Sequence, residues 1–170
     1  VEEENGMKPL QIKDQKSIFD MLSLKGKVAF VTGAGGGIGR ASAAALADVG
    51  ANVALMDIPQ KKDVLIENCK AIEERYHVKA IPVVGNVADE TDVIRMIDEV
   101  VKEFGRLDVV FSNAGIGGIQ DNPREIALDT WNKLLTVNQT GMFLVDRTAA
   151  NKMAELGNGG SIINTASMSG

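Results

Sequence analysis

The sequence predicts an α/β protein built on a doubly wound parallel sheet, and three observations support this fold class. Short apolar runs alternate with longer amphipathic stretches from Lys27 onward, which is the pattern of successive β-α-β units. Right-handed crossovers then place helices on both faces of the sheet. Polar or glycine residues follow most of the apolar runs, at the strand edge where such folds bind ligands. With 170 residues, 45% of them hydrophobic, the chain can bury the core of one domain.

Five strands are expected, each a run of five or six mostly apolar residues. They lie at residues 28–32, 52–57, 80–84, 107–112 and 161–166. Pro82 counts against the third strand, because proline cannot donate a hydrogen bond to a neighbouring strand. We expect residues 1–23 to be a leader and residues 24–170 to form the folded domain. We also expect the domain to be truncated after its fifth strand.

Four longer helices are expected between the strands, with apolar residues at helical spacing. They lie at residues 37–49, 61–76, 91–104 and 130–156, and a short leading helix is expected at 14–22. Thr91 is the expected N-cap of the helix at 91–104. The apolar face of the helix at 61–76 consists of Val64, Leu65, Cys69 and Ile72. The apolar face of the helix at 91–104 consists of Val93, Ile94, Ile97, Val100 and Val101.

Composition excludes several classes of function. The net charge is −5, whereas a nucleic-acid-binding domain needs a basic face. One cysteine and one histidine cannot build a disulfide framework or a closed zinc site; we expect Cys69 in a core or interface and His77 on the surface. No apolar run approaches the roughly 18 residues of a membrane span, and no signal peptide is recognisable. We therefore expect a cytoplasmic protein without a metal that binds a small molecule or another subunit.

A glycine-rich turn follows the first expected strand, with the sequence Thr-Gly-Ala-Gly-Gly-Gly-Ile-Gly at residues 32–39. The spacing Gly33-x-x-x-Gly37-x-Gly39 fits it, whereas G-x-G-x-x-G fits in no register. Glycines let a backbone approach a diphosphate closely, and the N–H groups at the start of the next helix attract the anion. The turn therefore predicts a dinucleotide site that includes Gly35 and Ile38 as well. The alternative is a strand-to-helix turn without a ligand.

An aspartate closes the second expected strand. Asp57 lies 57 − 37 = 20 residues after Gly37, where an acid hydrogen-bonds the adenosine ribose and repels a 2′-phosphate. Neither Gly36 nor Ile58 supplies an arginine for that phosphate, so we expect NAD rather than NADP. Lys61 and Lys62 are near enough to weaken this expectation. Alone, Asp57 is equally well explained as an ordinary strand-ending residue; together with the glycines it favours a ribose contact.

The remaining strand ends carry residues that are individually ordinary in turns. Asn86 and Val87 follow the third strand, Asn113-Ala114-Gly115 follows the fourth, and Ser167 follows the fifth. In a doubly wound sheet these strand ends share one edge. We therefore expect them to lie around the same ligand as Gly37 and Asp57.

Taken in order, these segments resemble the short-chain dehydrogenase/reductase family from about Leu24 to Gly170. The family's TGxxxGxG turn matches the three spaced glycines, and its acidic strand end matches Asp57. Its Asp-Val pair, which contacts the adenine, corresponds to Asn86-Val87, and its NNAG motif to residues 112–115 with Ser112 replacing the first asparagine. The resemblance implies a Rossmann-like fold in which Gly33, Gly35, Gly37, Ile38, Gly39, Asp57, Asn86, Val87, Asn113, Ala114 and Gly115 bind NAD.

The resemblance also implies a reaction and two catalytic residues. Such enzymes move a hydride between the nicotinamide and an alcohol or ketone carbon, and sugars or polyols are plausible substrates. Ser167 matches the serine that hydrogen-bonds the substrate oxygen, and Asn138 matches the helix asparagine of a proton relay. The family's base, the tyrosine of a Tyr-x-x-x-Lys motif, has no match here: the sole tyrosine, Tyr76, is expected at a helix end.

Two other functions stay open at this point. A module that binds a dinucleotide and senses its redox state would not need the missing motif. A methyltransferase using S-adenosylmethionine can also combine a glycine-rich turn with an acidic strand end, although Asn113-Ala114-Gly115 and Ser167 argue against it. The family usually forms dimers or tetramers, partly through the helix expected at 130–156, so we expect a homo-oligomer.

Overall fold

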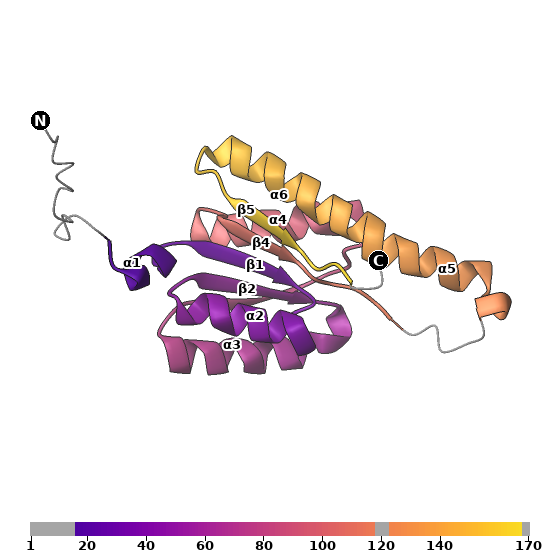
Figure 1. Cartoon of the computed structure of the whole chain (residues 1–170), viewed down its shortest axis with the longest axis horizontal. Coiled ribbons are helices and arrows are strands. Elements are labelled where there is room, and N and C mark those ends of the chain that lie inside the picture. Colours follow the sequence, from indigo (N-terminus) through magenta and orange to yellow (C-terminus); the bar gives the residue numbers. More distant parts are fainter. Residues whose placement is uncertain (1–15, 118–122, 168–170) are drawn as a thin grey trace, which may run out of the picture.

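A computed structural model describes residues 16–117 and 123–167, and it shows a parallel five-stranded sheet with helices on both faces (Figure 1). The strand order is β3-β2-β1-β4-β5. The strands are β1 (Val28–Thr32), β2 (Asn52–Asp57), β3 (Ala80–Val84), β4 (Val109–Ser112) and β5 (Ser161–Asn164). The expected Rossmann-like fold class is confirmed. The direction in which successive strands are added reverses at β1, whose neighbours are β2 and β4. Such a switch point opens a crevice at the carboxyl edge of the sheet.

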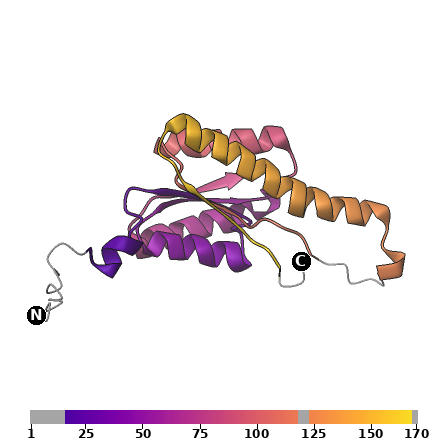
Figure 2. The same ribbon diagram turned by 45° about the horizontal axis from the view of Figure 1, so that its top comes forward.

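Two helices cover each face of the sheet, as the turned view in Figure 2 shows. On one face lie α2 (Gly37–Asp48) and α3 (Lys62–Tyr76), and on the other α4 (Glu90–Phe104) and α6 (Met142–Leu156). A short α1 (Ile18–Leu22) precedes β1, and α5 (Leu128–Leu135) leads into α6. Two 3-10 turns lie at Pro59–Lys61 and Pro123–Glu125. Among the described residues, no helix is both long and apolar enough to cross a bilayer.

Several element boundaries differ from those expected. The fourth strand begins at Val109 instead of residue 107, and the fifth ends at Asn164 instead of 166. The helix expected at 130–156 is three segments: α5, a π-helical stretch at Thr136–Gly141, and α6. The leading helix expected at 14–22 is observed only over Ile18–Leu22, and residues 14–15 lie outside the described part.

The N-cap expected at Thr91 is wrong. Helix α4 begins at Glu90 and its N-cap is Asp89, whose carboxylate accepts a hydrogen bond from the Asp92 N–H at 3.0 Å. A carboxylate can accept from the N3 amide of the first turn, and Asp89 is the acceptor placed one residue before the helix. Two residues expected on apolar faces are also exposed, Val64 at 36% and Ile94 at 45%.

The core consists of two clusters, one on each face of the sheet. Successive residues of β1 alternate between them: Val28 and Phe30 pack toward α4 and α6, and Ala29 and Val31 pack toward α2 and α3. This is the period-two geometry of a strand buried on both faces. Cys69 of α3 belongs to the second cluster, and burial, with a smaller contribution from Glu73, raises the pKa of its thiol to about 12. His77, by contrast, is an exposed residue after α3.

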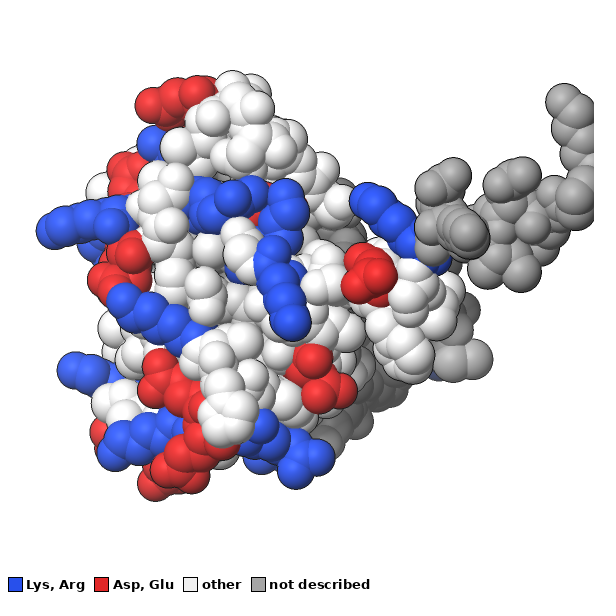
Figure 3. Space-filling view, turned by 90° about the vertical axis from the view of Figure 1, so that its left-hand side faces the viewer, with Lys and Arg blue, Asp and Glu red and all other residues white. Residues whose placement is uncertain are grey.

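A buried carboxylate joins the amino ends of β1 and β4. Asp108, 5% exposed, accepts hydrogen bonds from the Val28 N–H at 2.9 Å, from the Lys27 ammonium at 3.2 Å and from two nitrogens of Arg106. Figure 3 shows this end of the molecule, where acidic and basic side chains are interspersed. The two strands are thus fixed together at the edge opposite the glycine turn.

Candidate functional site

The glycine turn connects β1 to α2 at the carboxyl edge of the sheet. Gly33 has a φ of +68°, which favours glycine, and a Cβ there would lie 3.0 Å from the Ala114 Cα. A Cβ on Gly39 would collide with the Gly33 carbonyl oxygen. These two glycines therefore allow the turn to pack against its own helix and against the exit of β4.

Gly36 and Gly37 have a different role from Gly33 and Gly39. A Cβ added to either would meet nothing within 4 Å, and both residues, with Ile38, line a cavity. Helix α2 begins at Gly37, so the N–H groups of its first turn have no partner within the helix and carry the positive end of its dipole. This arrangement suits an anion such as a diphosphate.

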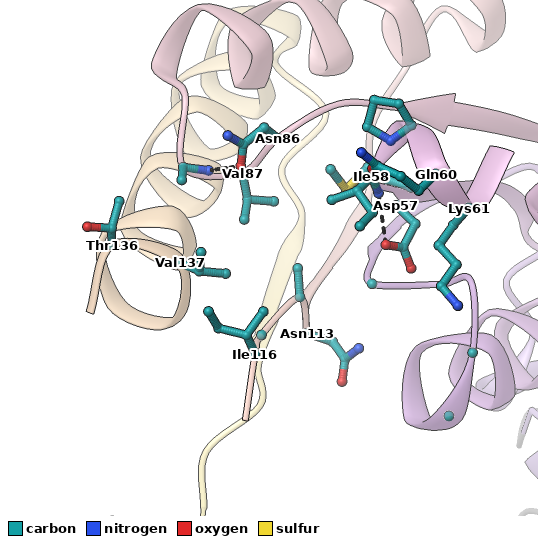
Figure 4. A pocket seen from close by; sticks show the side chains of 18 of the residues that line it. Asp57, Ile58, Gln60, Lys61, Asn86, Val87, Asn113, Ile116, Thr136 and Val137 are labelled. Carbon is teal, nitrogen blue, oxygen red and sulfur yellow. Dashed lines mark hydrogen bonds between the residues drawn. The ribbon is translucent and has the colours of Figure 1, made fainter. Parts of the chain in front are cut away.

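Asp57 lies beside the turn, and both of its carboxylate oxygens accept backbone hydrogen bonds. One accepts from the Gly35 N–H at 2.9 Å. The other accepts from the Ile58 N–H at 2.8 Å (Figure 4). A Cβ on Gly35 would stand 2.7 Å from the nearer oxygen. Gly35 therefore supports Asp57 and is not itself among the cavity-lining residues, whereas Asp57 is.

Asn86 and Val87 follow β3 and line the same cavity. The Asn86 side-chain oxygen accepts from the Ala88 N–H at 3.0 Å, and its backbone N–H donates to Asp92 at 3.1 Å. Hydrogen bonding from Arg95 is the main cause that lowers the pKa of Asp92, and desolvation opposes it less strongly. Val87 is 5% exposed. The orientation leaves the Asn86 amide N–H₂ group as a donor for a ligand.

Asn113 fixes the exit of β4 to that of β1. Its amide nitrogen donates to the Thr32 carbonyl at 3.1 Å, and the Thr32 hydroxyl accepts from the backbone N–H groups of Asn113 and Ala114, both at 2.9 Å. Thr32 is 1% exposed. Sequence reasoning did not assign it a role, because its partners lie some 80 positions away in the chain and only the strand register brings them together.

Asn138 lies in the π-helical stretch, a distortion that is frequent at functional sites. Its amide oxygen accepts from the Ile116 N–H and its amide nitrogen donates to the Ile116 carbonyl, each at 2.8 Å. Ile116 lines the cavity, whereas Asn138 is not among the lining residues. In this structure Asn138 therefore anchors the segment that follows Gly115.

Ser167 is the last described residue before the end of the chain, and it is exposed. The ladder between β4 and β5 continues past Asn164, because the Thr165 N–H donates to the Ser112 carbonyl at 3.1 Å. The Thr165 hydroxyl donates to the Asn113 side chain at 3.0 Å. Ser167 thus follows a segment attached to the cavity rim, but it is not among the lining residues.

The cavity has a volume of about 1080 Å³ and runs along the carboxyl edge of the sheet. In Figure 4 the residues after β2 lie at one end of it, and Thr136 and Val137 lie at the other. Sequence reasoning predicted nine of the residues that line it: Gly33, Gly37, Ile38, Asp57, Asn86, Val87, Asn113, Ala114 and Gly115.

Eleven lining residues were not predicted as part of the site. They are Gly36, Met56, Ile58, Pro59, Gln60, Lys61, Ala88, Ile116, Lys133, Thr136 and Val137. Most lie within four residues of a strand end, a signal that could have located them. Lys133, Thr136 and Val137 come from the α5 region, and only the fold brings them there. Of the two lysines considered near the ribose, Lys61 lines the cavity and Lys62 does not.

Residues 27–170 match the short chain dehydrogenase family. The chain belongs to the short-chain dehydrogenase/reductase family. Sorbose reductase of Candida albicans is 37% identical over 155 residues, which cover 91% of this chain and 54% of that protein. The chain spans a little over half the length of the curated relatives it matches.

Solved structures of short-chain dehydrogenases superpose on the chain. A family member from Mycobacterium marinum gives a TM-score of 0.86 at 37% identity, over 91% of this chain and 61% of that one. An NAD+-bound xylitol dehydrogenase gives 0.80 at 39%, over 86% and 55%. An NADPH-dependent 3-quinuclidinone reductase from Rhodotorula rubra gives 0.79 at 37%, over 96% and 61%. Family members similar to this chain therefore include users of either nicotinamide cofactor.

Proposed function

We propose that the chain binds NAD(H) in this cavity and serves an oxidoreductase that transfers a hydride between the nicotinamide and a secondary alcohol or ketone. The observation that carries the proposal is the glycine turn and Asp57 meeting at one elongated cavity. The open space in front of Gly36 and Gly37 fits the close approach of a diphosphate. Ile38 N–H would hold the diphosphate with them, and Gly33, Gly35 and Gly39 would shape the turn.

The adenosine would lie between Asp57 and Asn86. Each Asp57 oxygen accepts one backbone hydrogen bond and has lone-pair capacity left for a ribose hydroxyl. The negative charge would repel a 2′-phosphate, so we propose NAD(H) over NADP(H). Lys61 lines the same end of the cavity and acts in the opposite direction, since a cation attracts a phosphate.

Titration with reduced dinucleotides tests this assignment. NADH is expected to bind more tightly than NADPH. Asp57→Ala is expected to lower the ratio of the NADPH to the NADH dissociation constant about tenfold, corresponding to roughly 1.4 kcal/mol. Lys61→Ala is the control with the opposite expected effect and should raise this ratio. An unchanged ratio in Asp57→Ala would contradict the proposal that Asp57 discriminates NADH from NADPH. Binding of S-adenosylmethionine without binding of NADH contradicts the whole proposal.

The nicotinamide would lie toward the end of the cavity formed by Asn113, Ile116 and Thr136, because the glycine turn and Asp57 take up the other parts. The bound cofactor supplies the hydride chemistry. Ser167 would hydrogen-bond the substrate oxygen, and Asn138 would fix Ile116 at the cavity and hold a water in the proton relay. Proton exchange by a phenol is not assigned to this chain, because Tyr76, its sole tyrosine, ends α3 at the amino edge of the sheet.

We propose sugars or polyols as the substrate class. Similarity to proteins named sorbose reductase and xylitol dehydrogenase supports this choice. Calorimetric titration of xylitol into the NAD⁺-loaded protein and of sorbose into the NADH-loaded protein tests it. Saturable heat is expected for at least one of them and not for an acyl thioester; binding of the thioester alone would contradict the substrate class.

A second candidate is a redox-sensing module that binds the dinucleotide without catalysis. The cavity and the glycine turn would meet its requirements, because binding alone needs no acid–base residue. The two functions differ in two measurements, since a sensor binds NADH and NAD⁺ with clearly different affinities and gives no turnover with any alcohol or ketone. Turnover that is lost in Ser167→Ala argues for the oxidoreductase.

Association into a dimer or tetramer through α5 and α6 belongs to the same proposal. Leu128, Trp131 and Phe143 are 71%, 49% and 56% exposed on these helices, and apolar side chains of this size favour burial. Sedimentation velocity is expected to show a dimer or tetramer. Trp131→Lys should shift the distribution toward the monomer, and a wild-type chain that is monomeric at all concentrations would contradict this part.

A further inference from the structure

Asp146 of α6 joins the carboxyl ends of β4 and β5. The Ser112 hydroxyl donates to one oxygen of its carboxylate at 2.6 Å, and the Asn164 amide nitrogen donates to the other at 2.8 Å. Ser112 and Asn164 are partners in the ladder between the two strands, and Ser112 is 2% exposed. One carboxylate therefore holds both strand ends at the same level.

The bonds continue from this carboxylate to the cavity rim. Beyond Asn164, the Thr165 N–H donates to the Ser112 carbonyl, and the Thr165 hydroxyl donates to the Asn113 side chain. Asn113 in turn donates to the Thr32 carbonyl, next to Gly33. A connected set of hydrogen bonds thus runs from α6 across β5 and β4 to the glycine turn.

The charge of Asp146 is not explained by an ion pair. In the described part of the chain, the neighbouring Arg147 pairs with Glu90, and Lys152 pairs with Asp98 and Glu155, while no cation is paired with Asp146. Placing a carboxylate in a half-buried position has a desolvation cost. Its gain here is two acceptor oxygens in one rigid plane that meet two donors from adjacent strands.

We infer that Asp146 is a positioning residue, which fixes the exit of β5 against Asn113 and thereby sets where Ser167 stands relative to the cavity. Ser167 follows Asn164 by three residues. This inference rests on the proposed function for the roles of Asn113 and Ser167. The clamp of Ser112, Asp146 and Asn164 can nevertheless be measured without any cofactor.

Amide hydrogen exchange tests the clamp itself. Asp146→Ala is expected to speed exchange of the Thr165 amide about three- to tenfold, because the strand end opens more often once the two hydrogen bonds to the carboxylate are lost. The matched control is Asp98→Ala, which removes a carboxylate from the same α4–α6 layer but touches neither strand. Unchanged exchange at Thr165 in Asp146→Ala overturns the inference, whether or not the protein binds a dinucleotide.

Ligand binding tests the link to the site. In Asp146→Ala, NADH affinity is expected to fall about three- to tenfold while ADP affinity stays unchanged, because ADP lacks the nicotinamide half that the proposed function places beside Asn113. Asp146→Asn should restore most of the loss, since the Asn164 amide can flip and the Ser112 hydroxyl can rotate. Equal losses for NADH and ADP would indicate general destabilisation and overturn the inference.

Two further variants keep the test decisive if Asp146→Ala does not fold. Ser112→Ala and Asn164→Ala each remove one bond of the clamp and should show the same NADH-specific loss. The Ser112→Ala/Asn164→Ala double variant should lose less than the sum of the two, because the bonds share one acceptor group. Strict additivity argues against a clamp. A wild-type chain that binds no NADH rejects the proposed function and leaves the exchange result to decide on Asp146.

Discussion

At the scale of single residues, alanine substitutions at two glycines of the same turn are predicted to differ in their effects on stability and on NADH affinity. Gly36→Ala adds a methyl where nothing lies within 4 Å, and its extended φ of −173° suits any residue. Stability should change by no more than about 0.5 kcal/mol, whereas NADH affinity should fall at least tenfold, because the methyl enters the proposed diphosphate position.

Gly39→Ala is the counterpart in which the fold itself should suffer. Its methyl would collide with the Gly33 carbonyl oxygen, a backbone atom that cannot rotate away. We expect a loss of about 1–3 kcal/mol in unfolding free energy together with loss of NADH binding. Urea unfolding and NADH fluorescence measure both quantities. A Gly36→Ala variant that binds NADH like the wild type would contradict the placement of the diphosphate at this turn.

At the scale of elements, Asp89 and Thr91 at the start of α4 are predicted to contribute differently to stability. Asp89 accepts the Asp92 N–H and is the N-cap, whereas Thr91 lies inside the first turn. Asp89→Ala should lower the unfolding free energy by about 1 kcal/mol. Thr91→Ala should be close to neutral, because its hydroxyl is not the cap. Urea unfolding of the two variants checks this, and the reverse order would place the cap at Thr91 after all.

The limits of sequence reasoning are clearest in two other elements. Pro82 argued against a strand, yet β3 forms, because it is the edge strand and a proline can face outward there. The π-helical stretch was not predicted, since Asn138 and Gly141 weaken a helical pattern without specifying a π turn. It is recognisable only from its packing, in which Gly141 lies so close to Val87 that a Cβ would stand 2.8 Å from that side chain.

At the scale of the whole molecule, Asp108 is predicted to make stability depend on pH. Burial alone raises the pKa of Asp108, but hydrogen bonds from Arg106, the Val28 N–H and Lys27 outweigh it, and the pKa lies below its ordinary value. A lowered folded-state pKa stabilises the protein above the unfolded value of about 3.9. That contribution is lost as pH falls from there through the folded-state pKa.

The measurement is urea unfolding between pH 7 and pH 2.5. Asp108→Asn should cost about 1–3 kcal/mol at pH 7 and should show a flatter loss of stability on acidification than the wild type. Asp98→Asn, which breaks an exposed pair with Lys152, is the control and should change little. Parallel pH profiles for the wild type and Asp108→Asn would show that Asp108 is not responsible.

The whole fold was the most predictable level, and individual contacts were the least. Alternating apolar and amphipathic segments determine a doubly wound sheet, and parallel strands place Gly37, Asp57, Asn86 and Asn113 at one edge. The hydrogen bonds that orient these residues were not predictable. Thr32 and Asp146 act on partners distant in sequence, and their roles depend on a register that composition and spacing do not specify.

The buried position of Cys69 makes the chain its own reporter of local opening. A thiol with a pKa of about 12, shielded between α3 and the sheet, reacts with a disulfide reagent only when the helix lifts away. Since it is the single cysteine of the sequence, the labelling rate in native buffer would give the opening free energy of that layer without an engineered cysteine. A new cysteine at an exposed site could be labelled selectively while Cys69 remains unlabelled.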